Sequence, residues 1–460
     1  MSPVDWRPHA AWAGGLAVAA GTWYAMGSLA HRREQRHGYE LQGPELEVGA
    51  PDFLRAAEAL TSAPISGGND LEVLINGDRI FPVFLDTIRA ARRTVNLETY
   101  VYWRGDIAAD VAGCLVDKAR EGVEVNVILD AVGAAKMEAD LVDRMREAGV
   151  CVARFRPPRP YALQRLNNRT HRKLLIVDGE VGMIGGVGIA EEWTGDAQDP
   201  DHWRDTHVRV RGPVVRGLQG AFAENWLEAT GDVLVGDAYL PDLQPRQNGG
   251  PMQLVRSRAT VGDTNIEALY FLAIACARES LDLTAAYFAP RPAFVDALCD
   301  AAAQRGVRVR VLVPGRHIDK ELVRVAGRSE YDRLLEAGVE LYEYQPTMLH
   351  AKTLCIDGAW ASVGSVNFDN RSFQASDEAT LCVQSQRGPA AHRGVRGRPR
   401  GLRADAAGSL GAPPAAPAGG RARDEAHPAR AVATRPTAAP GPYRPKPTLC
   451  SSFSVRTQRT

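Results

Sequence analysis

Short apolar runs alternate with stretches of helical periodicity along residues 70–383. The runs are rich in β-branched residues, as in 123–129 and 307–313, and each of these follows a glycine that ends a predicted helix. Two successive units each have the order helix, strand, helix, strand, helix, strand. Such alternation favours an α/β fold with mostly parallel sheets. We therefore predict two similar halves, each a mostly parallel sheet flanked by helices, with one site at their interface.

The two units also repeat each other in sequence. Ala-Arg-Arg-Thr-Val-Asn-Leu at 91–97 corresponds to Ala-Arg-Glu-Ser-Leu-Asp-Leu at 277–283. We place the first half at residues 71–245 and the second at 246–386. Residues 37–70 are interpreted as a linker that contains one short helix. The 460 residues are enough for two domain-sized units, which fits a duplicated body.

One polar pattern occurs twice among the apolar runs, with 179 residues between the copies. It has His, then Lys two residues later, then Asp after four more residues: His171, Lys173 and Asp178, and again His350, Lys352 and Asp357. Seven residues after each Asp lies a turn of small residues, Gly185-Gly186 and Gly364-Ser365. A single copy would be weak evidence, because few positions are fixed. Two copies with matching flanks are strong evidence for a catalytic site.

The spacing suits chemistry on a phosphodiester. On an extended strand, His and Lys two residues apart project from the same face. One histidine can attack phosphorus and form a covalent intermediate, while its counterpart protonates the leaving oxygen and later deprotonates an alcohol. The lysines can stabilise the charge on the phosphoryl oxygens, so no metal or other cofactor is required. The apolar run and Asp-Gly pair after each lysine predict a buried strand closed by a turn.

Further segments support a family resemblance over roughly residues 70–383. They are Tyr-Val-Tyr-Trp at 100–103, His-Trp-Arg-Asp-Thr-His-Val-Arg-Val at 202–210, Gly-Pro-Val-Val at 212–215 and Phe-Asp-Asn-Arg-Ser-Phe at 368–373. With the paired motifs, they make the chain resemble the phospholipase D superfamily, and within it the bacterial cardiolipin synthases.

The resemblance implies a role for each motif residue. His171 would be the nucleophile and His350 the general acid and base. The phosphate would be held by Lys173, Lys352, Ser365 and Asn367, next to the turn that contains Gly185 and Gly186. Asp178 and Asp357 belong to the motif, and we expect them to organise the site more than to react.

The family also orients each histidine with a downstream carboxylate, which would fix the imidazole tautomer. Asp205 and Glu378 lie 34 and 28 residues after the histidines of their own halves. The alternative for either residue is an ordinary surface carboxylate at a strand start. The chain departs from the family at Gly188, where Asn is frequent, so one phosphate donor is missing or replaced by backbone.

Charge and cysteine content add little to the choice of function. The formal net charge is zero, yet residues 387–460 hold 14 Lys and Arg against 3 Asp and Glu, a local charge of +11. That basic segment could favour anionic lipid or nucleic acid. The seven cysteines are scattered without metal-binding spacing, which fits a reducing compartment, and we expect no metal site.

The two ends of the chain differ from the repeated body. Residues 10–30 lack charged side chains and are followed by a basic cluster, which predicts a single-pass membrane anchor within residues 1–36 and a catalytic body facing the cytoplasm. A cleaved signal peptide and a surface-lying segment are the alternatives. Residues 387–460, rich in Arg, Pro and Ala, predict a disordered tail or a frame-shifted replacement of the family's final helix.

The leading functional hypothesis is a membrane-bound phosphatidyltransferase of the cardiolipin synthase type. It would condense two phosphatidylglycerols to cardiolipin and glycerol through a phosphohistidine. A phospholipase stays open as the alternative, because water could resolve the same intermediate. A nuclease or an inactive lipid-binding relative is less favoured, since both motifs are intact and an anchor is predicted; we expect a phospholipid substrate and no nucleic acid.

Overall fold

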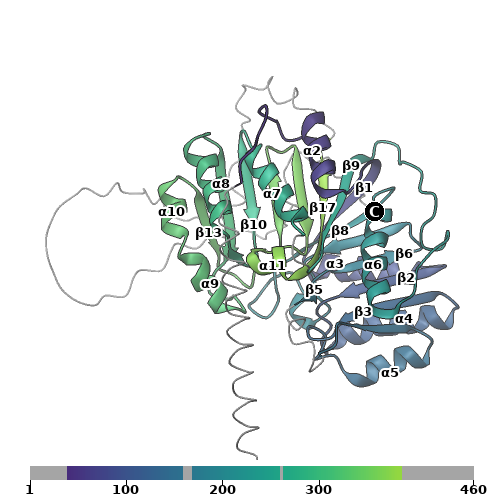
Figure 1. The fold of residues 1–460 in the computed structure, drawn as a ribbon. Coiled ribbons are helices and arrows are strands. Elements are labelled where there is room, and N and C mark those ends of the chain that lie inside the picture. The colour runs from purple at the N-terminus through teal and green to yellow at the C-terminus, as the bar shows by residue number, and fades with distance from the viewer. Residues whose placement is uncertain (1–38, 159–167, 260–262, 386–460) are drawn as a thin grey trace, which may run out of the picture.

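The computed structural model describes residues 39–158, 168–259 and 263–385 (Figure 1). The predicted N-terminal anchor at 1–36 and the predicted tail at 387–460 lie outside the described residues. No helix among the described residues is long and apolar enough to cross a membrane.

One mixed sheet runs through both halves of the molecule. The first half contributes β1 (Ile65–Ile75), β2 (Thr94–Thr99), β3 (Glu124–Asp130), β4 (Cys151–Phe155), β5 (Arg169–Thr170), β6 (Leu174–Val177), β7 (Val181–Gly185) and β8 (Thr206–Arg211). The second half contributes β9 (Gly250–Ser257), β10 (Ser280–Thr284), β12 (Arg308–Pro314), β13 (Glu340–Tyr344), β14 (Thr353–Ile356), β15 (Trp360–Gly364) and β17 (Ser376–Gln384). A separate small sheet pairs β11 (Phe288–Ala289) with β16 (Phe368–Asp369).

Helices cover the two faces of this sheet. In the first half they are α3 (Gly77–Arg89), α4 (Asp106–Arg120), α5 (Ala139–Glu147), the 3₁₀ turn η2 (Glu191–Trp193) and α6 (Val215–Thr230). In the second half they are α2 (Pro51–Thr61), α7 (Asn265–Ala275), α8 (Pro292–Ala303), α9 (Glu321–Arg328), α10 (Tyr331–Glu336) and α11 (Asn370–Gln374).

The strand order reveals the duplication. From the centre outwards, the first half reads β1-β8-β7-β6-β2-β3-β4 and the second reads β9-β17-β15-β14-β10-β12-β13. The two series correspond strand by strand and join where β1 pairs antiparallel with β9. The halves are therefore two copies of one α/β unit that share a continuous sheet, as Figure 1 shows.

The expected mostly parallel sheets are wrong in one respect. In the described part of each half, only two of the six pairings along the series are parallel: β2–β3 and β3–β4, and their counterparts β10–β12 and β12–β13. The reason lies in the Asp-Gly turns at 178–179 and 357–358, whose residues all have positive φ angles between 53° and 66°. Turns of this type join antiparallel neighbours, so the strand after each motif folds back on it.

The segment predicted as a linker takes part in the fold. α2 lies within it, and its Phe53 is fully buried in the core of the second half, with the ring centroid 6.4 Å from that of Trp360. β1 begins at Ile65, so the last residues of this segment already belong to the sheet. The apolar side of an amphipathic helix removes its surface from water here, which is a reason for the segment to be ordered.

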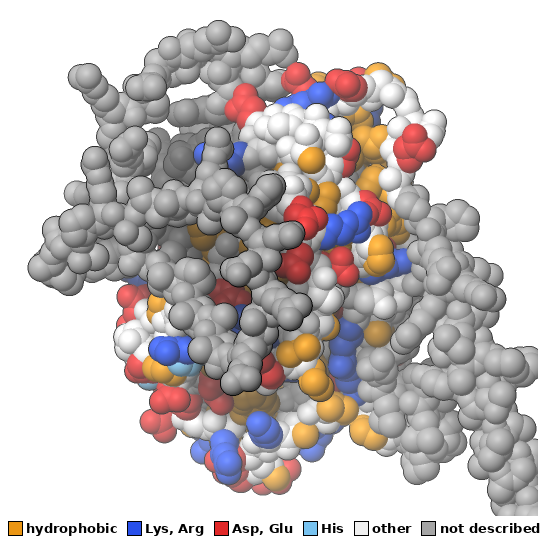
Figure 2. Space-filling model, turned by 90° about the vertical axis from the view of Figure 1, so that its left-hand side faces the viewer, with side chains coloured by type: hydrophobic (Ala, Val, Ile, Leu, Met, Phe, Trp, Pro, Cys, Tyr) orange, Lys and Arg blue, Asp and Glu red, His pale blue; other side chains and the backbone are white. Residues whose placement is uncertain are grey.

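The outer face formed by α8, α9 and α10, on the left in Figure 1, carries mixed charges. Figure 2 shows hydrophobic, acidic and basic side chains interspersed where described residues are visible. Arginines of α9 pair with nearby carboxylates, as in Arg324–Glu321 and Arg328–Glu343. Opposite charges that neutralise each other in this way leave little long-range field on this face.

The motif aspartates anchor strand ends. Asp178 accepts hydrogen bonds of 2.7–3.2 Å from the backbone N–H groups of 92–94, where β2 begins. Asp357 accepts the equivalent bonds of 2.7–2.8 Å from the N–H groups of 278–280 at the start of β10. Both carboxylates lie at the end of their strand that is remote from the motif histidine, so their contacts organise the half rather than reach the imidazole.

We predict that Asp178→Ala lowers the free energy of unfolding by about 2–3 kcal/mol, because three backbone donors lose a charged acceptor. Asp357→Ala has a smaller effect, since its partners are more exposed to water. Denaturant unfolding of the purified variants measures both. Asp86→Ala, which removes only an exposed helical ion pair with Arg89, is the control and changes stability by about 0.5 kcal/mol or less. A loss no larger than that of this control would contradict the anchoring role.

Candidate active site

The two motif histidines meet at the junction of the halves, held there by the backbone. The N–H of His171 donates to the carbonyl of Asp377, 2.9 Å away, where β5 pairs in parallel with β17. The N–H of His350 donates to the carbonyl of Arg204, 2.7 Å away. Each histidine is thus tied to the residue that precedes a carboxylate of the opposite half.

This backbone pairing sets the partner of each imidazole. Nδ1 of His171 lies 3.1 Å from both carboxylate oxygens of Glu378, and Nδ1 of His350 lies 2.7 Å from Oδ2 of Asp205. The expectation that each carboxylate serves the histidine of its own half is therefore wrong. The reason is that the segment just before each carboxylate pairs with the motif segment of the opposite half, β17 with β5 and Arg204 with Leu349, which sequence distance alone does not reveal. Neither Asp205 nor Glu378 is an ordinary surface residue, because both are fully buried.

The carboxylates orient the rings. With Nδ1–H donating to a carboxylate, Nε2 of each ring carries the lone pair. Burial opposes ionisation of Glu378, but the contact with His171 and the charge of Lys173 outweigh it and lower the pKa of this carboxyl group. Burial likewise opposes ionisation of Asp205, yet His350 and Lys352 lower its pKa. Both orienting groups are therefore carboxylates at neutral pH.

Both imidazoles are neutral in the free site. Burial lowers the pKa of His171 to about 4 and that of His350 to about 3, and the neighbouring lysines act in the same direction. The His171 side chain keeps 14% of its surface exposed, against 5% for His350. The first imidazole is thus the more accessible of the two.

The lysines lie beside the rings and are buried. Nζ of Lys173 donates to the carbonyl of His171, 2.8 Å away, whereas Nζ of Lys352 lies 3.2 Å from both ring nitrogens of His350. Burial lowers the pKa of Lys173 to about 7, helped by repulsion from Lys352, and burial lowers that of Lys352 to about 8. An anion bound between them would favour their charged forms, so the pair is suited to a phosphate group.

The small-residue turns fit their carboxylates. A side chain at Gly186 would lie 2.3 Å from Asp205 Oδ1, so only glycine leaves room for that carboxylate. At the corresponding position of the second half, the Ser365 hydroxyl donates to Oε2 of Glu378 over 2.5 Å. Gly185 is equally tight, with a Cβ position 2.5 Å from Nδ1 of His207. The two turns therefore support the carboxylates by different means.

The phosphate-binding roles of Ser365 and Asn367 stay predictions. The Ser365 hydroxyl is engaged by Glu378, while Oδ1 of the buried Asn367 has no hydrogen-bond partner among the described residues. The Gly188 position cannot hold a larger side chain without movement, because a Cβ there would lie 2.8 Å from Val101 and 3.1 Å from the Trp193 ring. Aromatic packing thus fills the space that a family asparagine would use.

Aromatic residues around the histidines were not assigned roles from the sequence. The Tyr100 ring lies 5.1 Å from that of His171, edge to face. Around His350 lie the rings of Trp193, Trp203 and Tyr287, at 5.1, 5.5 and 6.2 Å. Trp193 Nε1 also donates to Oδ2 of Asp205 over 2.9 Å. Tyr100 and Trp203 lie in the segments that carry the resemblance, but no motif indicated Trp193 or Tyr287.

A metal site is not evident within the described ranges, where no group of three or more His, Cys, Asp or Glu side chains is arranged to hold an ion.

Comparisons with known proteins agree with this geometry. The family model described as "Cardiolipin synthase, PLD-like domain" matches residues 84–199 and 270–393, and each segment contains one His-x-Lys motif. Cardiolipin synthase of Geobacillus sp. (strain WCH70) is 36% identical over 328 residues, which are 71% of this chain and 65% of the relative. Cardiolipin synthase 2 of Bacillus anthracis is 35% identical, with 71% and 63% covered. The match thus spans slightly less than two thirds of these relatives.

A solved structure shares the fold. The crystal structure of phosphatidylserine synthase from Haemophilus influenzae aligns with a TM-score of 0.52 at 12% identity, covering 72% of this chain and 86% of that chain. The family model covers more than half of the sequence, and both matched segments carry an intact motif at the shared site. The chain therefore belongs to the cardiolipin synthase family of phospholipase D-like proteins.

Proposed function

We propose that the protein is a phosphatidyltransferase that condenses two phosphatidylglycerol molecules to cardiolipin and glycerol. The observation that carries the proposal is the pair of imidazole–carboxylate contacts across the junction, His171–Glu378 and His350–Asp205, with a buried lysine beside each ring. The identity to curated cardiolipin synthases supports the choice of lipid.

In the first step, Nε2 of His171 attacks the phosphorus of one phosphatidylglycerol. The bond from phosphorus to the glycerol headgroup oxygen breaks, and that oxygen takes a proton from Nε2 of protonated His350. Glycerol leaves, and a phosphatidyl group stays on His171. His350 is neutral in the free site, so the negative charge of the bound diester has to raise its pKa before it can act as an acid.

In the second step, the headgroup hydroxyl of another phosphatidylglycerol attacks the phosphohistidine. His350 accepts the hydroxyl proton, the bond between phosphorus and Nε2 of His171 breaks, and cardiolipin is released. The lysines stabilise the phosphoryl oxygens in both steps. The greater exposure of His171 supports its role as nucleophile, because the nucleophile must meet a lipid phosphate.

The competing outcome is hydrolysis by water. Three aromatic rings surround His350, the group that would activate either acceptor. Rings packed around the group that activates the acceptor limit the entry of bulk water, which supports transfer over hydrolysis.

We also propose that the protein acts at the cell membrane. Its lipid substrate resides there, and the uncharged run at 10–30 is followed by basic residues, as expected of an anchor that leaves the catalytic body in the cytoplasm.

We predict that the wild-type protein in detergent converts phosphatidylglycerol to cardiolipin plus glycerol, and that His171→Ala lowers the rate at least about 1,000-fold because no nucleophile remains. Lipid analysis by mass spectrometry measures both products. Asp86→Ala, remote from the site, is the activity control. Phosphatidic acid as the main product would instead make the protein a hydrolase, and an active His171→Ala would overturn the assigned nucleophile.

A phosphatidyl p-nitrophenyl ester separates the roles of the histidines, because its leaving group needs no proton. We predict that His350→Ala releases a burst of about one p-nitrophenol per enzyme and then stalls with a modified His171. His171→Ala gives no burst. A burst from His171→Ala would mean that His350 is the nucleophile and His171 the general acid and base.

We predict that Trp203→Ala raises the share of phosphatidic acid among the products, because water then reaches His350 more easily. Trp203→Phe, which retains a ring 5.5 Å from the imidazole, keeps the product ratio of the wild type. Product ratios at equal turnover measure the effect. An unchanged ratio in Trp203→Ala would mean that this ring does not control the acceptor.

A further inference from the structure

The middle residue of the first motif differs from its counterpart in the second. Arg172 lies between His171 and Lys173 and is fully buried, whereas the second motif has Ala351 there, also buried. An arginine withdrawn from water needs partners for all of its donors. The duplicated site is therefore asymmetric immediately behind its nucleophile.

The Arg172 guanidinium group joins three elements. Its Nε donates to the carbonyl of Glu378 on β17, 3.2 Å away. One terminal nitrogen donates to the carbonyl of Ala221 on α6 (2.7 Å), and the other donates to the carbonyl of Ser257 on β9 (2.9 Å) and to Oε2 of Glu224 (2.9 Å). Glu378 and Ser257 are direct partners in the β9–β17 pairing, so Arg172 binds the carbonyls of both strands at one position of the register.

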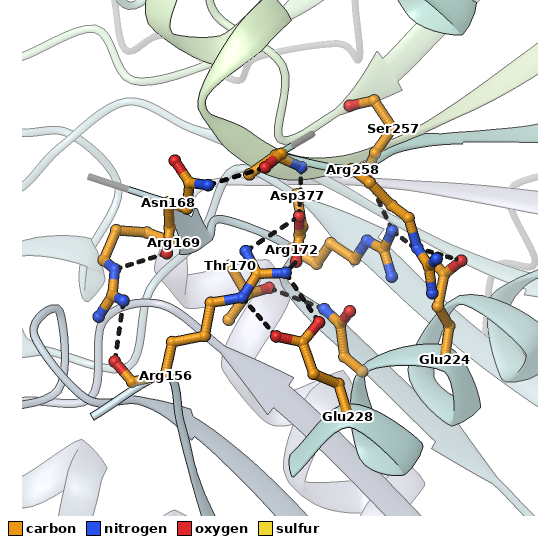
Figure 3. Close-up of polar contacts among 12 residues, drawn as sticks. Arg156, Asn168, Arg169, Thr170, Arg172, Glu224, Glu228, Ser257, Arg258 and Asp377 are labelled. Carbon is orange, nitrogen blue, oxygen red and sulfur yellow. Dashed lines mark hydrogen bonds and ion pairs between the residues drawn. The ribbon is translucent and has the colours of Figure 1, made fainter. Parts of the chain in front are cut away.

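Buried carboxylates keep this arginine charged. Burial acts to lower the pKa of Arg172, but Glu98, Asp377 and Glu224 outweigh it and raise the pKa. Glu98 and Asp377 are themselves fully buried. Figure 3 shows Arg172 with Glu224 and Asp377 at this junction. Arg258 forms a further ion pair with Glu224. This network of charged residues holds the Arg172 guanidinium group in a fixed position.

We propose that Arg172 is a positioning residue for the nucleophile, acting through Glu378. Two adjacent residues grip the strand that carries the orienting carboxylate: the N–H of His171 holds the carbonyl of Asp377, and the Arg172 side chain holds that of Glu378. The proposal rests on the proposed role of His171. Arg172 fixes the backbone of Glu378, so that the Glu378 carboxylate stays in contact with Nδ1 of His171. Nε2 of the same ring then points to the phosphorus atom.

The other half achieves the same end with an arginine from a different position, because the guanidinium group of Arg204 donates to the carbonyl of Asp205. The carbonyl of Asp205 accepts a 3.1 Å hydrogen bond from the backbone N–H of Asn76, and its carboxylate accepts one from Trp193. The asparagine side chain accepts a 3.3 Å bond from the N–H of Asp205. With Asp205 already fixed by these groups, an alanine at position 351 suffices.

The test is a double-mutant cycle of Arg172→Lys with Glu378→Gln. Lysine keeps the positive charge among the carboxylates but offers one nitrogen for four acceptors. The substrate is bis(p-nitrophenyl) phosphate, whose leaving group needs no proton, so its turnover by the full-length protein reports the attack by His171. Arg305→Lys is the matched control, because Arg305 also donates to three backbone carbonyls, those of 274, 275 and 277, away from the histidines.

We expect Arg172→Lys to lower kcat roughly tenfold or more, with KM within about twofold, because orientation and not binding is lost. In the Glu378→Gln background, Arg172→Lys lowers kcat by less than about threefold, because the carboxylate that Arg172 positions is already absent. Arg305→Lys changes kcat by less than about twofold in either background.

Equal losses in both backgrounds, or a loss no greater than that of Arg305→Lys, would overturn the proposal and leave Arg172 a purely structural residue. If Arg172→Lys does not yield folded protein, Glu224→Gln takes its place in the cycle, because this change weakens the contact between α6 and Arg172. Equal losses of kcat in both backgrounds, or a loss no greater than that of Arg305→Lys, again overturn the proposal. Cardiolipin formation by the wild type is measured alongside. Its absence with an intact cycle would reject the proposed lipid reaction and leave the role of Arg172 standing.

Discussion

The active site depends on two backbone hydrogen bonds that cross the junction between the halves. They join His171 to Asp377 and His350 to Arg204, and through them each imidazole reaches a carboxylate of the opposite half. Neither half contains a complete imidazole–carboxylate pair. A half alone would therefore lack the carboxylate contact that orients its imidazole. The continuous sheet across β1 and β9 is therefore a requirement of the chemistry, because it holds the two halves in the register that both backbone hydrogen bonds need.

The charges at the site explain why an anion completes it. Asp205 and Glu378 contribute −2 and both histidines are uncharged, whereas the two lysines contribute at most +2, because burial lowers the pKa of Lys173 to about 7 and that of Lys352 to about 8. A phosphodiester brings −1, which is offset when one imidazole takes up a proton. Binding of an anion and protonation of an imidazole are thus coupled through the local charge balance. In the proposed mechanism, the acid then forms only when a leaving group is present.

Local sequence was sufficient for the strands, the duplication and the motif residues that meet at the site, because these follow from periodicity and motif spacing over a few residues. The α/β class and the family were predicted correctly. The parallel sheets were not, since the strand order in space decides which neighbours are antiparallel, and the Asp-Gly turns at 178–179 and 357–358 were recognised without drawing that consequence. The crossed pairing of Asp205 and Glu378 depends on tertiary contacts far apart in the chain, and no local pattern encodes them. Arg172 was hidden within the motif itself, because a basic residue next to a catalytic histidine gives no sign of being buried.

Duplication gave two sites the same motif, and later differences gave them unequal surroundings. Both carboxylate residues have a backbone carbonyl bound by an arginine, Arg204 at Asp205 and Arg172 at Glu378, but Asp205 lies next to Gly186 and the Trp193 indole, whereas Glu378 lies next to Ser365. The longer glutamate needs more restraint than aspartate, because it has one more rotatable bond to fix. The half with Glu378 supplies that restraint with the Ser365 hydroxyl on the carboxylate, and the imidazole that Glu378 orients is the more exposed one. The enclosed imidazole lies among three aromatic rings, where proton transfer is shielded from water. Two identical motifs can thus carry different steps of one reaction, since the residues around each ring, and not the motif, determine its access and its protonation.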